Sequence, residues 1–284
     1  MTKKIFFISD FFANQITGGG ELNDWELMSL LREKGYIVEY QNSQKIKPEM
    51  VSELVKLGYK FIVSNFCNLS EDCAQSIINS KSYVICEHDH KYLSSRNPMG
   101  YPDYKVPQEE IINKEFYENA KAVFCQSGFH MNILKQNLQI DNLISLGGNL
   151  WSTEHLDILE EMNKEEKEES YAVVNYTTPH KNTADAIRYC KQKKINYCLI
   201  NPCFPEEFLR KLGKNKALVF FPQSPETLSR IVVEARMMGM SAKTTKNIGA
   251  AHEEWFLKKG LDLVEVMRAK RKEIPEAILG SLYE

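Results

Sequence analysis

Residues 217–239 read ALVFFPQSPETLSRIVVEARMMG and place a strand, a turn and a helix in direct succession. The apolar run ALVFFP has the length and residue content of a buried strand. The turn QSPE leads into the helical pattern TLSRIVVEARMMG, which ends at Gly239, a residue suited to a left-handed helix C-cap. A strand followed by a helix in this way is typical of the βα units that build parallel sheets.

The same alternation of strand and helix patterns runs along the whole chain of 284 residues. The predicted strands are 4–9, 36–41, 59–65, 82–88, 122–127, 143–147, 171–176, 196–201, 217–222 and 241–245. Several of them are almost continuously apolar, which indicates strands covered on both faces. Between the two sets of strands, residues 152–170 pass from a helical pattern into a charge run, as at a domain boundary. We therefore expect an α/β protein of two Rossmann-like domains with parallel sheets, residues 1–151 and 152–284, facing each other across a ligand-binding cleft.

The composition is that of a globular protein and excludes several classes of function. Hydrophobic residues make up 43% and charged residues 26%, and the net charge of −2 gives no basic field for binding nucleic acid. The basic run 267–273 is interpreted as a solvated helix face. No stretch approaches the ~20 apolar residues that span a bilayer, and the N-terminus lacks a signal-peptide pattern, so we expect a cytoplasmic protein. The seven scattered cysteines indicate buried reduced thiols.

Two segments of the first domain carry candidate site residues. Gly18, Gly19 and Gly20 precede a helix, and such a loop either binds phosphate through its amides or is a plain flexible turn. It is not GxGxxG, which argues against a dinucleotide oxidoreductase. The fourth strand ends in CEHDHKY (86–92), where a carboxylate beside an imidazole can polarise a hydroxyl group.

The same histidine segment has two other interpretations. Cys86, His88 and His90 alternate as metal ligands would, but no further ligand follows at a suitable spacing, so we predict no metal site. Alternatively, the histidines bond only to loop carbonyl groups.

Charged residues follow two strands of the second domain. Lys181 lies at the start of a helix, where a lysine opposes the helix dipole; a bound anion would remove that conflict, whereas the alternative is a lysine extended into water. Glu226, Arg230 and Glu234 are spaced i, i+4, i+8, as in an exposed ion-paired stripe. If that face is instead buried, Glu234 needs a specific partner.

Residues 221–255 resemble the donor-binding region of retaining GT-B glycosyltransferases, especially family 4. The likeness consists of Glu226, seven intervening residues, Glu234 in an "EA" pair, then Gly239, a strand and Gly249 in a loop. A weaker likeness extends to the glycine loop, the histidine segment, residues 125–134 and Lys181. Two departures stand out: Thr-Leu-Ser follows Glu226 where the family usually has Gly-Phe-Gly, and Tyr176 replaces an arginine five residues before Lys181.

The resemblance implies a role for each candidate residue. Glu234 would bind the nucleotide ribose, Glu226 would face the donor sugar, and Lys181 would hold and stabilise the leaving diphosphate without a metal or other cofactor. The backbone amides that would join Lys181 belong to Gly19, Gly20, Thr227 and Leu228. His88 or Asp89 would lie near the acceptor hydroxyl, and domain closure would align donor and acceptor.

The sequence thus predicts a metal-independent, retaining glycosyltransferase that moves a sugar from a nucleotide diphosphate sugar to a glycan or lipid-linked hydroxyl acceptor. The expected partners are that donor and acceptor and no nucleic acid, with peripheral membrane contact left open. Two alternatives remain at this point. One is a non-catalytic nucleotide-sugar or glycan-binding protein of the same fold, and the other is a nucleotide-sugar epimerase or phosphorylase.

Overall fold

The structure is a computed structural model that describes residues 3–283, and every predicted strand range in it contains a strand. All strand pairs are parallel, as predicted. The chain folds into two compact units. Unit 1 comprises Met1–Leu150 with Lys270–Glu284, and unit 2 comprises Trp151–Ala269.

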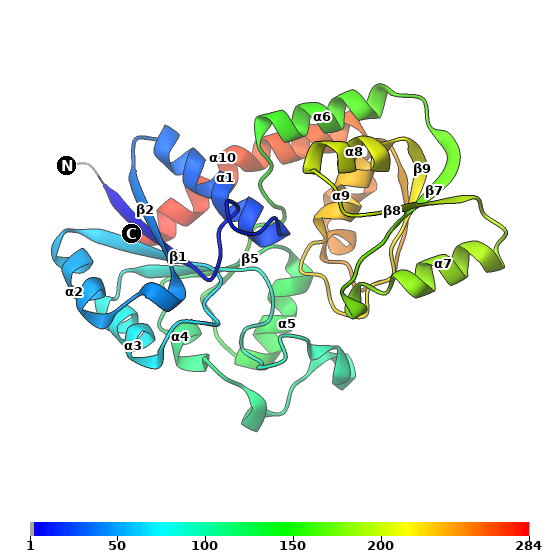
Figure 1. Cartoon of the computed structure of the whole chain (residues 1–284). Coiled ribbons are helices and arrows are strands. Elements are labelled where there is room, and N and C mark those ends of the chain that lie inside the picture. Colours follow the sequence, from blue (N-terminus) through cyan, green and yellow to red (C-terminus); the bar gives the residue numbers. More distant parts are fainter. Residues whose placement is uncertain (1–2, 284) are drawn as a thin grey trace. The chain divides into compact units, whose positions relative to one another are not determined.

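Unit 1 is a six-stranded sheet with helices on both faces (Figure 1). Its strands are β1 (Lys4–Ser9), β2 (Ile37–Asn42), β3 (Tyr59–Val63), β4 (Tyr83–Glu87), β5 (Val123–Cys125) and β6 (Leu143–Ser145), in the order β2-β1-β3-β4-β5-β6. Its helices are α1 (Gly19–Glu33), α2 (Pro48–Lys56), α3 (Glu71–Ser80), α4 (Lys114–Glu118) and α5 (Gly128–Leu138). Alternate strand residues such as Phe6 and Phe61 pack against α2 to α5, whereas Ile5 and Phe7 face α1. Burial on both faces explains the continuous apolar runs.

Unit 2 repeats this plan around a four-stranded sheet in the order β10-β9-β7-β8. Its strands are β7 (Glu168–Val174), β8 (Tyr197–Ile200), β9 (Asn215–Val219) and β10 (Ser241–Lys243), and its helices are α6 (Thr153–Lys164), α7 (Thr183–Gln192), α8 (Pro205–Gly213) and α9 (Arg230–Met237). Leu218 on β9 packs against α6, α8 and α9 on one face, and Val219 packs against α7 on the other. The predicted charge run 152–170 consists of α6 and the start of β7.

The last helix, α10 (Leu261–Tyr283), begins in unit 2 and ends in unit 1. Its apolar residues Ile274, Ile278 and Leu282 are fully buried beside β1, in the same cluster as Ile5. The division between Leu150 and Trp151 lies next to the expected boundary. Burial of this helix face places residues 270–283 with unit 1, whereas they were expected in the second domain. Across residues 3–283, no helix combines the length and apolar character needed to cross a membrane.

The cysteines are all free thiols, but they are not all buried as the sequence predicted. Cys67 and Cys198 are exposed and Cys203 is partly exposed. Cys198 lies on β8, an edge strand of the unit 2 sheet, and Cys67 follows β3. These positions lie outside the apolar cores. The prediction of burial rested on apolar runs around other cysteines, and it did not hold for these three.

Candidate functional site

The strand order reverses once in each sheet, and ligands of open α/β sheets bind at the carboxyl ends of the strands beside such a reversal. The reversal lies between β1 and β3 in unit 1 and between β7 and β9 in unit 2. The predicted site residues divide between the units: Gly19, Gly20, His88 and Asp89 belong to unit 1, and Lys181, Glu226, Thr227, Leu228 and Glu234 belong to unit 2.

In unit 2 the structure brings together two predicted residues, Lys181 and Glu226. Lys181 ends a 3-10 helix, η5 (Pro179–Lys181), after β7, and Glu226 lies in the loop after β9. Nζ of Lys181 donates to Oε1 and Oε2 of Glu226 at 2.8 and 3.0 Å. The lysine side chain is 27% exposed and the glutamate side chain 13%. A cation that still reaches solvent beside a fixed carboxylate can bind an anion, while the carboxylate accepts hydroxyl groups.

Helix α9 begins at Arg230 and not at Thr227, where the sequence pattern predicted it. Ser229 has a left-handed backbone, with φ 75° and ψ 80°, and this conformation interrupts the helix. The loop before it is fixed by hydrogen bonds from Glu226 N to Asn247 O (2.8 Å), from Gly249 N to Glu226 O (2.8 Å) and from Ala250 N to Leu228 O (3.0 Å). The side chain of Leu228 is fully buried, so this predicted donor-binding residue presents only its backbone to a ligand.

Glu234 lies on the buried face of α9, and the alternative of an exposed ion-paired stripe is therefore wrong. The partners that approach its Oε1 are Trp151 Nε1 at 2.9 Å, His155 Nε2 at 3.3 Å and Arg230 Nε at 3.7 Å. Burial raises the pKa of Glu234, but these partners together outweigh burial and lower the pKa to about 2. The acid is ionised and has specific partners, which an alanine at this position would leave without an acceptor.

The pKa of the Tyr176 hydroxyl group depends on both acidic positions of unit 2. Burial raises the pKa of its hydroxyl group, and the carboxylates of Glu226 and Glu234 raise it further. Nζ of Lys181, which pairs with Glu226, lies 5.9 Å from the centroid of the Tyr176 ring. Sequence reasoning noted Tyr176 only as the replacement of an arginine, and no pattern in the sequence indicated this shared position.

In unit 1 the predicted residues Gly20 and His88 are in contact. A Cβ atom at Gly20 would lie 3.1 Å from Cδ2 of His88, so the absence of a side chain lets α1 approach the imidazole. Nε2 of His88 lies 2.6 Å from Oδ1 of Asp24, and its Nδ1 lies 2.7 Å from Nε2 of Gln126. Burial lowers the pKa of His88, but the Asp24 carboxylate outweighs burial and raises the pKa above its ordinary value. The imidazole is thus fixed through both nitrogens. The other predicted glycine, Gly19, is exposed at the start of α1.

Sequence reasoning missed Asp24, the carboxylate that holds His88. Asp24 lies on α1, is fully buried, and accepts a second hydrogen bond from the hydroxyl group of Ser64. The available signal was a polar pair, Asn23 and Asp24, within a helix whose neighbouring residues Leu27 and Met28 enter the core. A buried carboxylate needs partners, and here they come from the segments that follow two strands of the sheet.

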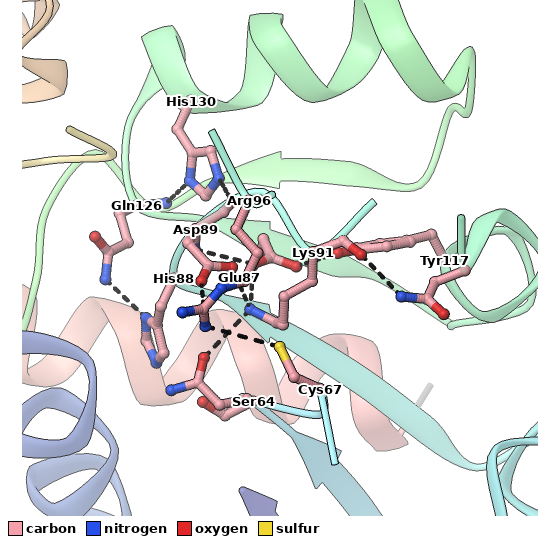
Figure 2. A network of polar contacts seen from close by, with 12 residues as sticks. Ser64, Cys67, Glu87, His88, Asp89, Lys91, Arg96, Tyr117, Gln126 and His130 are labelled. Carbon is pink, nitrogen blue, oxygen red and sulfur yellow. Dashed lines mark hydrogen bonds and ion pairs between the residues drawn. The ribbon is translucent and has the colours of Figure 1, made fainter. Parts of the chain in front are cut away.

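Asp89 belongs to a network of ion pairs around the buried Lys91 (Figure 2). Nζ of Lys91 donates to Oδ1 of Asp89 at 2.9 Å and also to the Glu87 carboxylate, to which the Tyr117 hydroxyl group donates as well. Arg96 pairs with Oδ2 of Asp89 at 3.2 Å. Burial raises the pKa of Asp89, but Lys91 and Arg96 outweigh burial and hold the pKa well below its usual range. Asp89 is an ionised member of this network, which fixes the segment that follows His88.

The three residues of the alternative metal site lie in different surroundings. Cys86 is buried in the apolar cluster beside α1, and burial raises the pKa of its thiol well above the ordinary value. His90 packs edge-on against the ring of His130, with centroids 5.2 Å apart, whereas His88 is held by Asp24. Within residues 3–283, no group of three or more His, Cys, Asp and Glu side chains is arranged to hold a metal ion.

Comparison with known proteins gives matches among solved structures alone. No protein-family model and no curated protein matches the chain. The catalytic domain of starch synthase IV from Arabidopsis thaliana, bound to ADP and acarbose, matches with a TM-score of 0.57 and 10% identity, over 99% of this chain and 95% of that one.

Two further structures match over a similar extent. HepE from Anabaena, in complex with UDP and glucose, matches with a TM-score of 0.53 and 13% identity, over 98% of this chain and 93% of that one. An alpha-glucosyltransferase in complex with UDP and a 13-mer DNA matches with a TM-score of 0.52 and 12% identity, over 100% of this chain and 95% of that one. The chain has the GT-B fold. The predicted α/β class with two parallel sheets is thereby confirmed, while identities this low carry no substrate or activity from one GT-B protein to another.

Proposed function

We propose that the chain is a glycosyltransferase that moves a sugar from a nucleotide diphosphate sugar to a hydroxyl acceptor, either a glycan or a lipid-linked molecule. The observation that carries this proposal is the Lys181–Glu226 pair at the strand reversal of unit 2. The GT-B structures that match the chain were solved with UDP or ADP, which supports a nucleotide as the ligand of this fold.

The donor diphosphate would bind to Lys181 and to the backbone amides of Thr227 and Leu228. The positive end of α9 adds to the favourable field for an anion. As the bond between sugar and diphosphate breaks, negative charge grows on the leaving phosphate, and these fixed groups stabilise it. A lysine and oriented amides can provide the charge stabilisation that a metal ion supplies elsewhere, so we propose a metal-independent reaction.

The two glutamates would orient the rest of the donor. The carboxylate of Glu226, fixed by Lys181, would accept hydrogen bonds from hydroxyl groups of the donor sugar. Glu234 is ionised, and its three protein partners approach Oε1. Its other oxygen, Oε2, would accept from the ribose hydroxyl groups.

We assign the acceptor hydroxyl to unit 1, beside His88. Asp24 and Gln126 occupy both ring nitrogens of His88, so the imidazole would position the acceptor by packing and not through a hydrogen bond of its own. Asp89 would act through the Lys91 network, which holds the segment after His88. Attack of the acceptor on the same face from which the diphosphate leaves would retain the anomeric configuration, as in the family that the paired glutamates resemble.

The proposal is tested by incubating the protein with UDP-, GDP- and ADP-sugars and an acceptor mixture, and measuring nucleoside diphosphate release and glycosylated product. We expect one donor to be consumed in the presence of EDTA, and Lys181→Ala to lower turnover about 10²- to 10³-fold. Lys211→Ala is the matched control, because Lys211 forms an exposed ion pair with Glu207 on α8. Equal activity of the two variants, or no consumption of any donor, would contradict the proposal.

A non-catalytic nucleotide-sugar-binding protein is the second candidate. It is favoured by Tyr176, which supplies no positive charge where the family has an arginine. In this case a nucleoside diphosphate would bind and Lys181→Ala would weaken its binding, but no donor would be turned over with any acceptor.

A further inference from the structure

Ser229, the residue immediately before α9, has a left-handed backbone conformation that glycine adopts more readily than serine. Its φ of 75° and ψ of 80° lie in the left-handed region, where a Cβ atom is strained. The loop that imposes this conformation is fixed on one side by the backbone bonds of Glu226 and Leu228 to residues 247–250. A glycine would satisfy the same backbone without strain, so the serine side chain calls for an explanation of its own.

The hydroxyl group of Ser229 is also buried without a partner. The residue is 7% exposed, and within residues 3–283 its Oγ makes no hydrogen bond. In particular, it does not cap α9, which has no side-chain hydrogen bond at its N-terminus. A buried hydroxyl group without a partner is unfavourable, and serine is therefore disfavoured here on two independent grounds. A ligand that accepts a hydrogen bond at this position would remove one of them.

The surroundings of Ser229 favour an anion as that ligand. The amide groups at the N-terminus of α9 carry partial positive charge. Lys181 neutralises Glu226, three positions before Ser229 in the chain, and the next residue, Arg230, neutralises Glu234. The formal charges of these two pairs cancel, and the partial positive charge of the helix N-terminus would favour an anion.

We propose that the Ser229 hydroxyl group donates a hydrogen bond to a phosphate oxygen of the donor diphosphate. This inference rests on the proposed function and assigns to the donor site a side chain that the Gly-Phe-Gly pattern of the resembled family does not provide. Ser229 would thus supply one of the polar contacts to the diphosphate in a chain that has Tyr176 in place of an arginine.

The test compares Ser229→Gly with Ser229→Ala by calorimetric titration with inorganic pyrophosphate and with UDP, GDP and ADP. Both variants lose the hydroxyl group, and we expect affinity for pyrophosphate and for the bound nucleoside diphosphate to fall about ten- to hundredfold in each. Ser229→Gly also relieves the backbone strain, so its melting temperature should rise by about 2–4 °C. A weaker binder that is a more stable protein cannot be explained by damage to the fold.

The outcomes separate this inference from the proposed function. Unchanged or tighter binding of the nucleoside diphosphate by a folded Ser229→Gly variant would overturn the role of Ser229 and leave the proposed function standing. Pyrophosphate binding that depends on Ser229, with no nucleoside diphosphate bound, would support the anion contact and contradict the nucleotide donor. A wild-type protein that binds neither probe would overturn both.

Discussion

The two units each hold a lysine among carboxylates, and the two sites differ in how completely the protein surrounds the charge. Lys91 of unit 1 is 1% exposed and contacts Glu87, Asp89 and Asn65. Lys181 of unit 2 is 27% exposed and pairs with one carboxylate. A buried cation whose donors bond to the protein holds the chain in place. A cation that still reaches solvent remains able to bind a ligand, and from this difference we propose a scaffold role for Lys91 and a binding role for Lys181.

The largest effect predicted from this comparison is on stability. Lys91→Met should reduce the free energy of unfolding by about 3–5 kcal/mol, because it leaves the buried Glu87 carboxylate without its cation. Lys181→Met should cost less than about 1 kcal/mol, because that pair is partly exposed. Urea denaturation of both variants measures the difference. Equal losses would remove the distinction between the two lysines.

Glu234 is the acid of unit 2 that behaves like the buried residues of unit 1, and its stability contribution should depend on pH. Its pKa of about 2 lies below the unfolded value of 4.5, so the stability that its ionised form contributes is present above about pH 4.5 and is lost as the pH falls toward 2. The wild type should lose about 2 kcal/mol more than Glu234→Gln between pH 7 and pH 3. Chemical denaturation at the two pH values tests this, and parallel losses would show that Glu234 titrates normally.

Nucleotide binding at the Lys181–Glu226 pair should change when the carboxylate is removed. In Glu226→Gln, Lys181 no longer shares its charge with an acid, and we expect the nucleoside diphosphate to bind about tenfold more tightly while sugar transfer falls. Calorimetric titration measures the affinity, with Glu207→Gln, an exposed ion-pair partner on α8, as the control. Weaker binding by a folded Glu226→Gln variant would show that the pair binds the diphosphate as a unit.

The smallest predicted effect concerns His88 in unit 1. Burial lowers the pKa of His88, and the Asp24 carboxylate is the main group that raises it. In Asp24→Asn this carboxylate is absent, so the pKa of His88 should fall below its ordinary value. Because the native pKa is raised, the stability from protonated His88 is present below pH 6.5 and lost as the pH rises through that pKa; the variant should lack it. An NMR titration of the imidazole tests this, with the exposed Asp72→Asn as the control. An unchanged pKa of His88 would show that Asp24 does not raise it.

The sheets could be predicted from the sequence because each strand is a local apolar run buried on both faces, as in KIFFIS of β1. The contact between Lys181 and Glu226 could not, because it joins residues 45 positions apart that meet at the ends of neighbouring strands. The late start of α9 escaped prediction for a similar reason. The loop before the left-handed Ser229 is held by bonds of Glu226 and Leu228 to residues 247–250, which the local helical pattern does not contain.

The polar network around His88 and Lys91 in unit 1 was predicted only in part. His88 was proposed as a site residue because it follows a strand, where ligands of α/β sheets bind. Asp24 and Lys91 were missed, because a polar residue in a helix or loop is normally solvated, and only the folded structure shows these two side chains buried. Residues that hold a site in place have weaker sequence signals than those that resemble a known motif.

Whether unit 2 binds the donor is tested by calorimetric titration of the wild type, Lys181→Ala and Glu234→Ala with UDP, GDP, ADP, CMP and NAD in EDTA. We expect one nucleoside diphosphate to bind the wild type selectively. Glu234→Ala should weaken this binding by about 1–3 kcal/mol, and Lys181→Ala should weaken it without unfolding the protein. If no nucleotide binds the folded wild type, or if both variants bind it unchanged, unit 2 is not the donor-binding unit.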